Sequence, residues 1–289
     1  MDIFIFSEEE KKLILENFKL EKLKIVVRLF KRGQIKRGIK FFKHFKLSLF
    51  SMFNYRKKMN KVDVFEEMNQ AGGVMRYGIP AYRLPDYAID KDINFIKSIG
   101  VNIKTNTRVG KDISMETLEK EYDAVFLGTG FFKARDLNIP GADHKNVVGA
   151  MDFLPQQNKV VAGDELQNQI LATGKHVVVI GGGDTGSDCV GTSNRHHATS
   201  VSQFELMPQP PVKENKEMVW PNWPLKLRTS SSHEEGCERD WSVTTKSFVG
   251  ENGNVKEIIA ARVEWKDGKM VEVPNSEFIL KADLVLLAM

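Results

Sequence analysis

The sequence has 289 residues, 42% of them hydrophobic and 28% charged, which is typical of a globular protein with a hydrophobic core. No uncharged apolar run approaches the roughly 20 residues that a membrane-spanning helix needs. The start of the chain, MDIFIFSEEEKK, carries acids where a secretion signal carries bases. Cys189 and Cys237 are the only cysteines, too few for a disulfide framework or a cluster held by four thiolates, so we expect a cytoplasmic location.

The first 60 residues differ in charge from the rest of the chain. They hold 16 Lys and Arg against 6 Asp and Glu, whereas the remainder holds 26 against 32. Residues 7–30 predict a helix, and residues 31–61 interleave basic side chains with phenylalanines. This basic helical extension could bind a membrane surface or nucleic acid. We favour a helical hairpin whose aromatic rings pack on the rest of the protein, and no nucleic-acid partner, because no base-reading or anchoring motif accompanies the charge.

From residue 61 onward, short apolar runs alternate with segments of helical spacing, which is typical of an α/β fold. The predicted elements, in chain order, are a strand at 62–65, an ordered loop at 69–85, a helix at 86–99 ended by Gly100, a strand at 101–105, a short helix capped by Ser114, and a strand at 122–127.

The second half of the chain begins with a predicted helix from Ala150 and ends on a run of strands. Its later elements are a strand before Gly181, a helix to about 197, a strand at 200–205, a Pro/Trp-rich stretch at 207–224, strands at 243–249, 255–265, 270–273 and 278–280, and a buried parallel strand at 283–289. Asp267-Gly268 predicts a tight hairpin turn.

The stretch HVVVIGGGDTGSD, from His176 to Asp188, carries the clearest functional signal. A β-branched strand runs into Gly181, Gly183 and Gly186, which stand at the G-x-G-x-x-G spacing of a dinucleotide-binding turn. The first glycine allows the turn, the second lets the backbone approach a pyrophosphate, and the third lets the helix pack near the strand. Free N–H groups at the helix start would then face the phosphates. The alternative is a glycine turn without a ligand.

An acid at the end of the following strand supports the nucleotide interpretation. Glu205 comes 19 positions after Gly186, where a carboxylate binds the ribose 2′-hydroxyl. We therefore predict NAD(P)H binding by Gly181, Gly183, Asp184, Thr185, Gly186 and Glu205. NADH is favoured over NADPH, because the carboxylate would repel a 2′-phosphate. The alternative is an ordinary acid at a strand end.

Several longer motifs resemble one known family. GGVMRYGIPAYRLP, YDAVFLGTG, FLPQQNK, VVVIGGGDTGSDCVGTSNR, FELMPQPP, RTSSSHEEGCERDW and ADLVLLAM are together similar to the small (beta) subunit of glutamate synthase. The resemblance implies an FAD- and NAD(P)H-dependent oxidoreductase that takes a hydride from NAD(P)H onto FAD. It also implies a large (alpha) subunit partner, which receives the electrons through iron–sulfur clusters and forms glutamate from 2-oxoglutarate and glutamine-derived ammonia.

The resemblance also implies a set of flavin contacts. Glu66 matches the acid that binds the FAD ribose, residues 72–80 match the loop along the flavin, and residues 129–130 match a second contact. The implied flavin residues are Glu66, Gly72, Gly73, Arg76, Tyr77, Gly78, Ile79, Pro80, Thr129 and Gly130. Hydride transfer requires stacked rings rather than a proton donor from the protein, so no catalytic acid or base is predicted.

The sequence departs from the family pattern in three places. It lacks the cysteine-rich iron–sulfur motifs, the first G-x-G-x-x-G for the FAD pyrophosphate, and the segment that follows ADLVLLAM in the family. We therefore expect the middle of a small subunit, truncated at both ends, behind an unrelated leader. The predicted organisation is a basic extension at 1–60, a partial FAD-binding domain at 61–149, and a Rossmann-like, doubly wound NAD(P)H-binding domain at 150–289.

Other readings of particular residues, and of the whole chain, remain open. His233, Glu234 and Glu235 could suggest a metal site, but consecutive side chains diverge and no second histidine stands at ligand spacing. His196-His197 is interpreted as a charge at a helix C-terminus, and Cys189 as a small buried hydrophobic residue. The chain could instead be a dinucleotide-binding module without redox activity, an inactive truncated product, or a basic-arm protein that binds anionic partners.

Overall fold

The computed structural model describes residues 61–130, 137–219 and 225–289. These residues divide into two compact units: the first contains 61–73 and 86–130, and the second contains 74–85, 137–219 and 225–289. The helices expected before residue 61 lie outside the described residues. Within the described ranges, no helix is long and apolar enough to cross a membrane.

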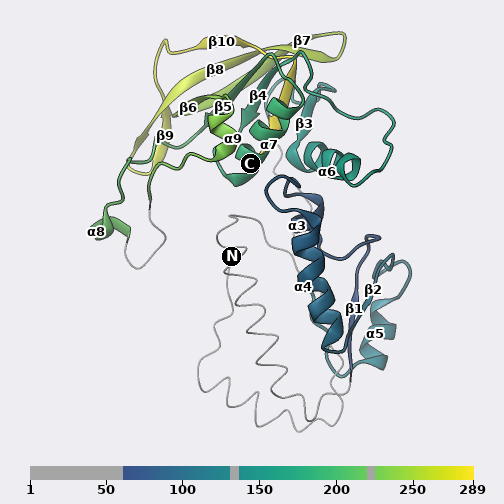
Figure 1. The fold of residues 1–289 in the computed structure, drawn as a ribbon. Coiled ribbons are helices and arrows are strands. Elements are labelled where there is room, and N and C mark those ends of the chain that lie inside the picture. Colours follow the sequence, from purple (N-terminus) through teal and green to yellow (C-terminus); the bar gives the residue numbers. More distant parts are fainter. Residues whose placement is uncertain (1–60, 131–136, 220–224) are drawn as a thin grey trace. The chain divides into compact units, whose positions relative to one another are not determined.

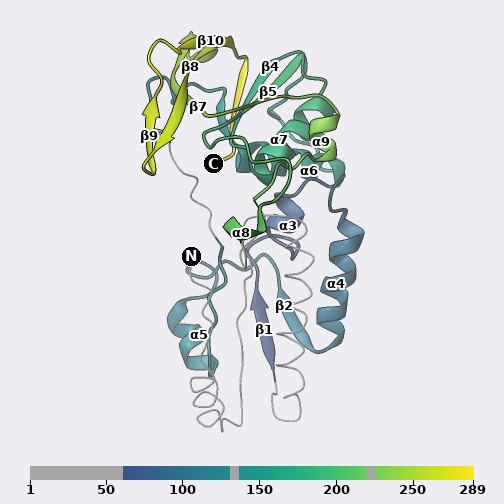
Figure 2. The ribbon, with the colours of Figure 1, turned by 90° about the vertical axis from the view of Figure 1, so that its left-hand side faces the viewer.

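The first unit is built on two parallel strands, β1 (Val62–Phe65) and β2 (Val101–Lys104). Helices α4 (Asp86–Ser98) and α5 (Met115–Glu121) flank the strand pair, as Figure 2 shows. Gly100 adopts a φ of +95° after α4, and its N–H donates to the carbonyl of Lys97, as expected of a glycine that ends a helix.

A small core holds α5 against the strands. Phe65, Leu118 and Tyr122 are buried together, and the rings of Phe65 and Tyr122 meet edge to face at 6.0 Å. The Ser114 hydroxyl accepts the N–H of Thr117 at 3.1 Å, which confirms the predicted N-cap of α5. Local capping and this apolar cluster therefore fix the position of α5.

The strand predicted at 122–127 is wrong. Residues 124–130 form no regular element, and Phe126 and Leu127 are 54% and 64% exposed. A strand needs a neighbour for its N–H and C=O groups, and β1 and β2 pair only with each other among the described residues. An apolar run alone therefore did not suffice to make a strand.

The second unit contains a five-stranded parallel sheet in the order β3-β11-β4-β5-β6 (Figure 1). Its strands are β3 (Val147–Gly149), β4 (His176–Ile180), β5 (Ser200–Glu205), β6 (Glu238–Trp241) and β11 (Leu284–Leu287). The final strand of the chain, β11, lies between β3 and β4 and is parallel to both. This arrangement confirms the prediction of a buried parallel strand at the end of the sequence.

Helices cover one face of this sheet. The helices of the second unit are α3 (Val74–Tyr77), α6 (Ala150–Val161), α7 (Asp184–Arg195), α8 (Lys216–Val219) and α9 (Ser231–Glu234). Val177 and Val179 of β4 pack with Phe153 of α6 and Val190 of α7 in one buried cluster. Alternate residues of a strand face opposite sides, so Val178 contributes to a second cluster behind the sheet.

An antiparallel sheet covers the other face. It contains β7 (Val243–Glu251), β8 (Asn254–Lys266), β9 (Lys269–Glu272) and β10 (Phe278–Lys281). Phe248 and Ile258 of this sheet pack with Val178. The hairpin between β8 and β9 turns at Asp267 and Gly268, whose φ values of +51° and +73° confirm the predicted tight turn. The α/β fold class is confirmed, with a sheet rather than helices on the second face.

The predicted boundary between residues 149 and 150 does not match the division of the chain. Strand β3 precedes that boundary and yet pairs with β11 in the parallel sheet. Residues 74–85 also belong to the second unit, although they were assigned to the partial FAD-binding domain. Contacts between segments far apart in sequence decide both assignments, and the local composition of the sequence does not reveal such contacts.

Candidate functional site

The glycine turn between β4 and α7 has the geometry predicted from its spacing. Gly181 has a φ of +127°, and a Cβ placed there would lie 2.4 Å from the carbonyl oxygen of Ala288. A Cβ on Gly186 would lie 2.0 Å from the carbonyl oxygen of Gly181. A Cβ on Gly183, by contrast, would meet no heavy atom of the described residues within 4 Å. The first and third glycines are therefore required by packing, while the second borders open space that a ligand can fill.

Glu205 lies over the same turn. One carboxylate oxygen accepts the N–H of Gly182 at 2.9 Å, and the other accepts the N–H of Met207 at 3.0 Å. A Cβ on Gly182 would lie 2.4 Å from this carboxylate, so the middle glycine makes room for the acid. The structure thus brings the predicted ribose acid and the predicted phosphate turn together.

The start of α7 offers polar groups to a ligand. Gly183 is the N-cap residue of this 12-residue helix, and no side chain in residues 61–130, 137–219 or 225–289 caps its first turn. The carboxylate oxygen Oδ2 of Asp184 is buried and has no hydrogen-bond partner within the described part of the chain. Thr185 follows it, half-buried, in the same turn. Uncapped N–H groups, a buried acceptor without a donor and open space at Gly183 all fit a bound dinucleotide.

The residues predicted to contact flavin are divided between the two compact units. Glu66, Gly72, Gly73, Thr129 and Gly130 belong to the first unit, and the residues from Arg76 to Pro80 belong to the second. Neither unit by itself therefore contains the whole predicted set.

Glu66 has a local structural role. Its carboxylate accepts the N–H of Met68 at 2.9 Å, and its carbonyl accepts the N–H of Thr107. The nearby Asp63 carboxylate is fully buried and takes hydrogen bonds from Asn102 and Tyr122. Burial alone would raise the pKa of Asp63, but those hydrogen bonds and the charges of the neighbouring lysines outweigh burial and lower it. The Asp63 carboxylate is thus stabilised as an anion within the first unit.

Residues 74–85, named here the clamp segment, are fastened to α6 by one side chain. The Asn158 amide nitrogen donates to the carbonyls of Arg76 and Ile79 at 2.9 and 2.7 Å, and its oxygen accepts the N–H of Ala81 at 3.2 Å. Asn158 is 8% exposed, so these bonds are shielded from water. One buried amide therefore organises the loop that contains Gly78, Ile79 and Pro80.

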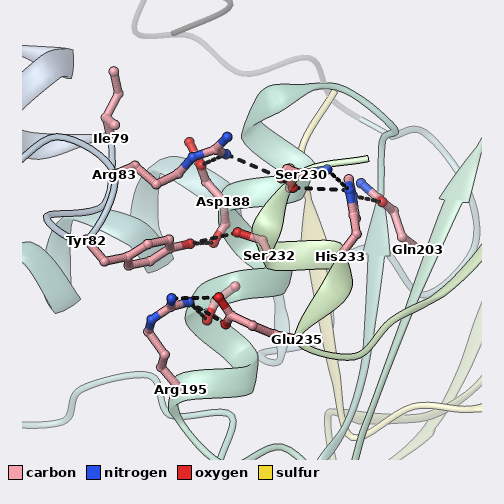
Figure 3. A network of polar contacts seen from close by, with 12 residues as sticks. Ile79, Tyr82, Arg83, Asp188, Arg195, Gln203, Ser230, Ser232, His233 and Glu235 are labelled. Atoms are coloured by element: carbon pink, nitrogen blue, oxygen red, sulfur yellow. Dashed lines mark hydrogen bonds and ion pairs between the residues drawn. The ribbon is translucent and has the colours of Figure 1, made fainter. Parts of the chain in front are cut away.

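The clamp segment is also fastened to α7, as Figure 3 shows. The Arg83 guanidinium forms an ion pair with Asp188 at 2.5 Å, with side chains only 16% and 7% exposed. The guanidinium of Arg195 lies 3.5 Å over the Tyr82 ring and also pairs with Glu235 through two hydrogen bonds of 2.7 Å. These contacts run from Asp188, one turn into α7, to Arg195 at its last residue, so the clamp segment lies along this helix.

Burial changes the protonation of Asp188. It raises the pKa of this carboxyl from its ordinary value of 3.8 to about 6, while the Arg83 charge acts in the opposite direction. The ion pair therefore loses its anionic partner under mildly acidic conditions.

A chain of hydrogen bonds behind the glycine turn was not predicted. Gln203 is 2% exposed, and its amide nitrogen donates to the carbonyl of Gly181 at 2.8 Å. Its amide oxygen lies 2.9 Å from Nε2 of His233, whose Nδ1 accepts the N–H of Ser230 at 3.1 Å. The sequence did carry one signal, a glutamine in the interior of strand β5, because strands of a parallel sheet are buried and a buried amide needs hydrogen-bond partners.

The interpretation of His196 as a helix-end charge is wrong. His196 follows α7 but is 7% exposed, and Ala172 and Gln157 hydrogen-bond to its two ring nitrogens. Burial, followed by the neighbouring His197, lowers the pKa of His196 and favours the neutral ring. Cys189 is fully buried, as predicted. Within the described ranges, no three His, Cys, Asp or Glu side chains are placed to hold a metal ion.

Comparisons with known proteins agree with the sequence motifs and the fold. Residues 88–289 match the pyridine nucleotide-disulphide oxidoreductase family. The glutamate synthase [NADPH] small chain of Mycobacterium tuberculosis is 46% identical over 233 residues, which is 79% of this chain and 48% of that protein. The glutamate synthase [NADH] of Saccharomyces cerevisiae is 40% identical over 79% of this chain and 11% of its own length. The resemblance to glutamate synthase small chains is confirmed, and this chain spans about half the length of the bacterial relative.

Solved structures show the same fold at low sequence identity. The structure of FprA, an oxidoreductase of Mycobacterium tuberculosis, in complex with NADPH superposes with a TM-score of 0.66 at 17% identity. The match covers 93% of this chain and 70% of FprA. Because the family match extends over more than half of the sequence, the chain belongs to the pyridine nucleotide-disulphide oxidoreductase family.

Proposed function

We propose that this chain binds NAD(P)H at the glycine turn and serves in electron transfer of the glutamate synthase small-chain type. The observation that carries the proposal is the turn itself, in which Gly183 borders open space beside the uncapped start of α7. Gly181, Gly183, Asp184, Thr185, Gly186 and Glu205 would hold the nucleotide. The relatives named as glutamate synthases support the type of reaction.

The bound nucleotide would supply a hydride for an electron acceptor. The residues of the chain would provide binding and orientation: N–H groups of the turn for the pyrophosphate, and the Glu205 carboxylate for a ribose hydroxyl. No proton transfer by a side chain is required, so no catalytic acid or base is assigned.

NADH is the preferred nucleotide under this proposal. Both oxygens of Glu205 are held by backbone N–H groups, which fixes a negative charge beside the turn. A 2′-phosphate at that place would be repelled, whereas a 2′-hydroxyl could donate to the carboxylate. Relatives are named for either nucleotide, so the geometry of Glu205 carries this preference.

FAD fits this chain incompletely. Glu66, the Gly72–Pro80 loop, Thr129 and Gly130 resemble its contacts in the family, but the sequence contains no second G-x-G-x-x-G for its pyrophosphate. We therefore assign no step to FAD in this chain, and iron–sulfur clusters enter the proposal only through the family.

A large glutamate synthase subunit is the proposed partner in the cytoplasm. It would use the electrons to form glutamate from glutamine and 2-oxoglutarate. A dinucleotide-binding module without redox activity is the second candidate, favoured by the incomplete flavin set. Reduction of an artificial acceptor by NADH in the presence of added FAD would separate the two.

Titration calorimetry of the chain with NADH and NADPH tests the proposed site. Gly183→Val should abolish binding and leave the fold intact, because its side chain would occupy only the open space that the ligand needs. Ala162→Val, at an exposed position after α6 with a φ of −75°, is the control and should bind as the wild type does. Retained affinity in Gly183→Val would refute the assignment.

A further inference from the structure

We propose that His233 is a positioning residue for the nucleotide turn, acting through Gln203 on the carbonyl of Gly181. The inference rests on the proposed nucleotide site and adds the residues that hold it in shape. His233 does not touch the turn itself; it lies on α9, 52 positions after Gly181, and is joined to the turn through Gln203. Figure 3 shows the contacts of His233 with Gln203 and Ser230.

The direction of every bond in this chain is fixed by chemistry. The carbonyl of Gly181 can only accept, so the Gln203 group that faces it is the amide NH₂. The other end of Gln203 is then an acceptor and requires a donor, which makes Nε2 of His233 the protonated ring nitrogen. Nδ1 is left as an acceptor for the N–H of Ser230. His233 must therefore be neutral and in a single tautomer.

The surroundings of His233 maintain that neutral form. Burial, followed by the positive charges of Arg239 and Arg83, lowers the pKa of His233 to about 4. At neutral pH the ring therefore keeps both its donor and its acceptor.

The packing of α7 leaves the turn carbonyl little freedom. A Cβ on Gly186 would come within 2.0 Å of the Gly181 oxygen and 2.6 Å of the Gln203 amide nitrogen. The third glycine of the motif thus makes room for a buried hydrogen bond, in addition to bringing helix and strand together. The carbonyl and the N–H groups that follow it belong to the same rigid turn, so holding the first also aims the second.

Hydrogen bonds and close packing hold the short helix α9 against α7, so the backbone of His233 is fixed in position. Ser230 Oγ lies 2.5 Å from Ser187 Oγ, and the Asn194 amide donates to the carbonyl of Gly236 at 2.8 Å. A Cβ on Gly191 would lie 2.4 Å from Ser232 Oγ, which shows how closely the two helices approach. The polar chain therefore links two elements that are packed together.

Two substitutions separate positioning from simple capping of α9. His233→Gln places an amide nitrogen as many bonds from Cβ as Nε2, so it can still donate to Gln203. His233→Asn places an oxygen where Nδ1 stands, so it can still accept from Ser230 but cannot reach Gln203. If His233 positions the turn, the Asn variant should raise the Kd for NADH about tenfold, and the Gln variant should stay within about threefold of the wild type.

Hydrogen exchange gives a second readout that does not depend on nucleotide. In His233→Asn, the backbone amides of Gly181 and Gly182, which donate to the Phe204 carbonyl and the Glu205 carboxylate, should exchange about tenfold faster than in the wild type, as for loss of one buried hydrogen bond, while His233→Gln retains protection. Glu235→Gln weakens the ion pair that joins α9 to Arg195 of α7 but leaves the hydrogen bonds of His233 and Gln203 in place. It therefore serves as the control for lost stability.

The outcomes distinguish this inference from the proposed function. Wild-type protein that binds neither NADH nor NADPH would defeat the proposed function, and the exchange rates would still test the positioning. If His233→Asn and His233→Gln change the Kd for NADH and the exchange rates equally, or if only His233→Gln changes them, His233 only caps α9. Gln203→Met should match His233→Asn, and the double variant should add nothing; additive losses would overturn the inference.

Discussion

At the scale of single residues, Glu205 serves both the turn and the proposed nucleotide. Glu205→Gln keeps an acceptor for one backbone N–H but removes the charge, so the ratio of NADPH to NADH dissociation constants should fall about tenfold. Glu205→Ala should lower this ratio as well. It should also weaken the binding of both nucleotides, because the N–H of Gly182 loses its acceptor. Calorimetry measures all four constants, and an unchanged ratio in both variants would make Glu205 purely structural.

A second prediction at this scale concerns the buried pair of Asp188 and Arg83. The folded-state pKa of Asp188, about 6, lies above its ordinary value of 3.8, so the folded protein holds the proton more tightly than the unfolded chain does. The contribution of Asp188 to the free energy of unfolding is therefore fully present below pH 4 and is lost as the pH rises through 6. At 1.36 kcal/mol per pKa unit, the loss is about 3 kcal/mol.

Asp188→Asn removes this titration and is the matched comparison. Other groups titrate alike in both proteins, so the difference in unfolding free energy, wild type minus variant, should fall between pH 4 and pH 7. Urea unfolding at several pH values measures that difference. A difference that stays constant or rises over this range would contradict the raised pKa.

At the scale of elements, the clamp segment depends on α6. Asn158→Leu would leave two carbonyls and one N–H of the segment without their partner, at a cost of about 2–4 kcal/mol. The amides of residues 76–83 should then exchange faster than those of the parallel sheet, as measured by hydrogen exchange with mass spectrometry. Lys159→Ala, at the next position of α6, is the control. If the amides of the clamp segment remain protected from exchange in Asn158→Leu, the contacts of Tyr82 and Arg83 with α7 suffice to hold the segment.

At the scale of the whole molecule, the question is whether this chain by itself binds FAD. Without a second glycine turn, FAD loses several charge-assisted hydrogen bonds to its pyrophosphate, each worth roughly 1.5–3 kcal/mol. We predict that the chain purified without added flavin shows no absorption band near ~450 nm, a region typical of bound flavin cofactors. A stoichiometric band that NADH bleaches would contradict this prediction.

The sequence did not predict the strands whose pairing depends on a segment far away along the chain. Strand β6 carries the polar run Glu238–Trp241, and it exists because the edge of β5 is available to it. Strand β3 has only three residues and pairs with β11, which follows it by more than 130 positions. The apolar run at 122–127 shows the reverse case, since it has the composition of a strand but pairs with no strand in the described part of the chain.

The sequence by itself determined the glycine turn between β4 and α7 and the acid beside it, because glycine spacing, strand pattern and the following acid all lie within 30 residues. Local rules of this kind also set the caps of α4 and α5 and the hairpin at Asp267. Only the tertiary structure decided that the clamp segment belongs with the second unit, and that His233 and Gln203 stand behind the turn. Buried hydrogen bonds join residues far apart in sequence, and a linear pattern records the polarity of each partner but not the pairing.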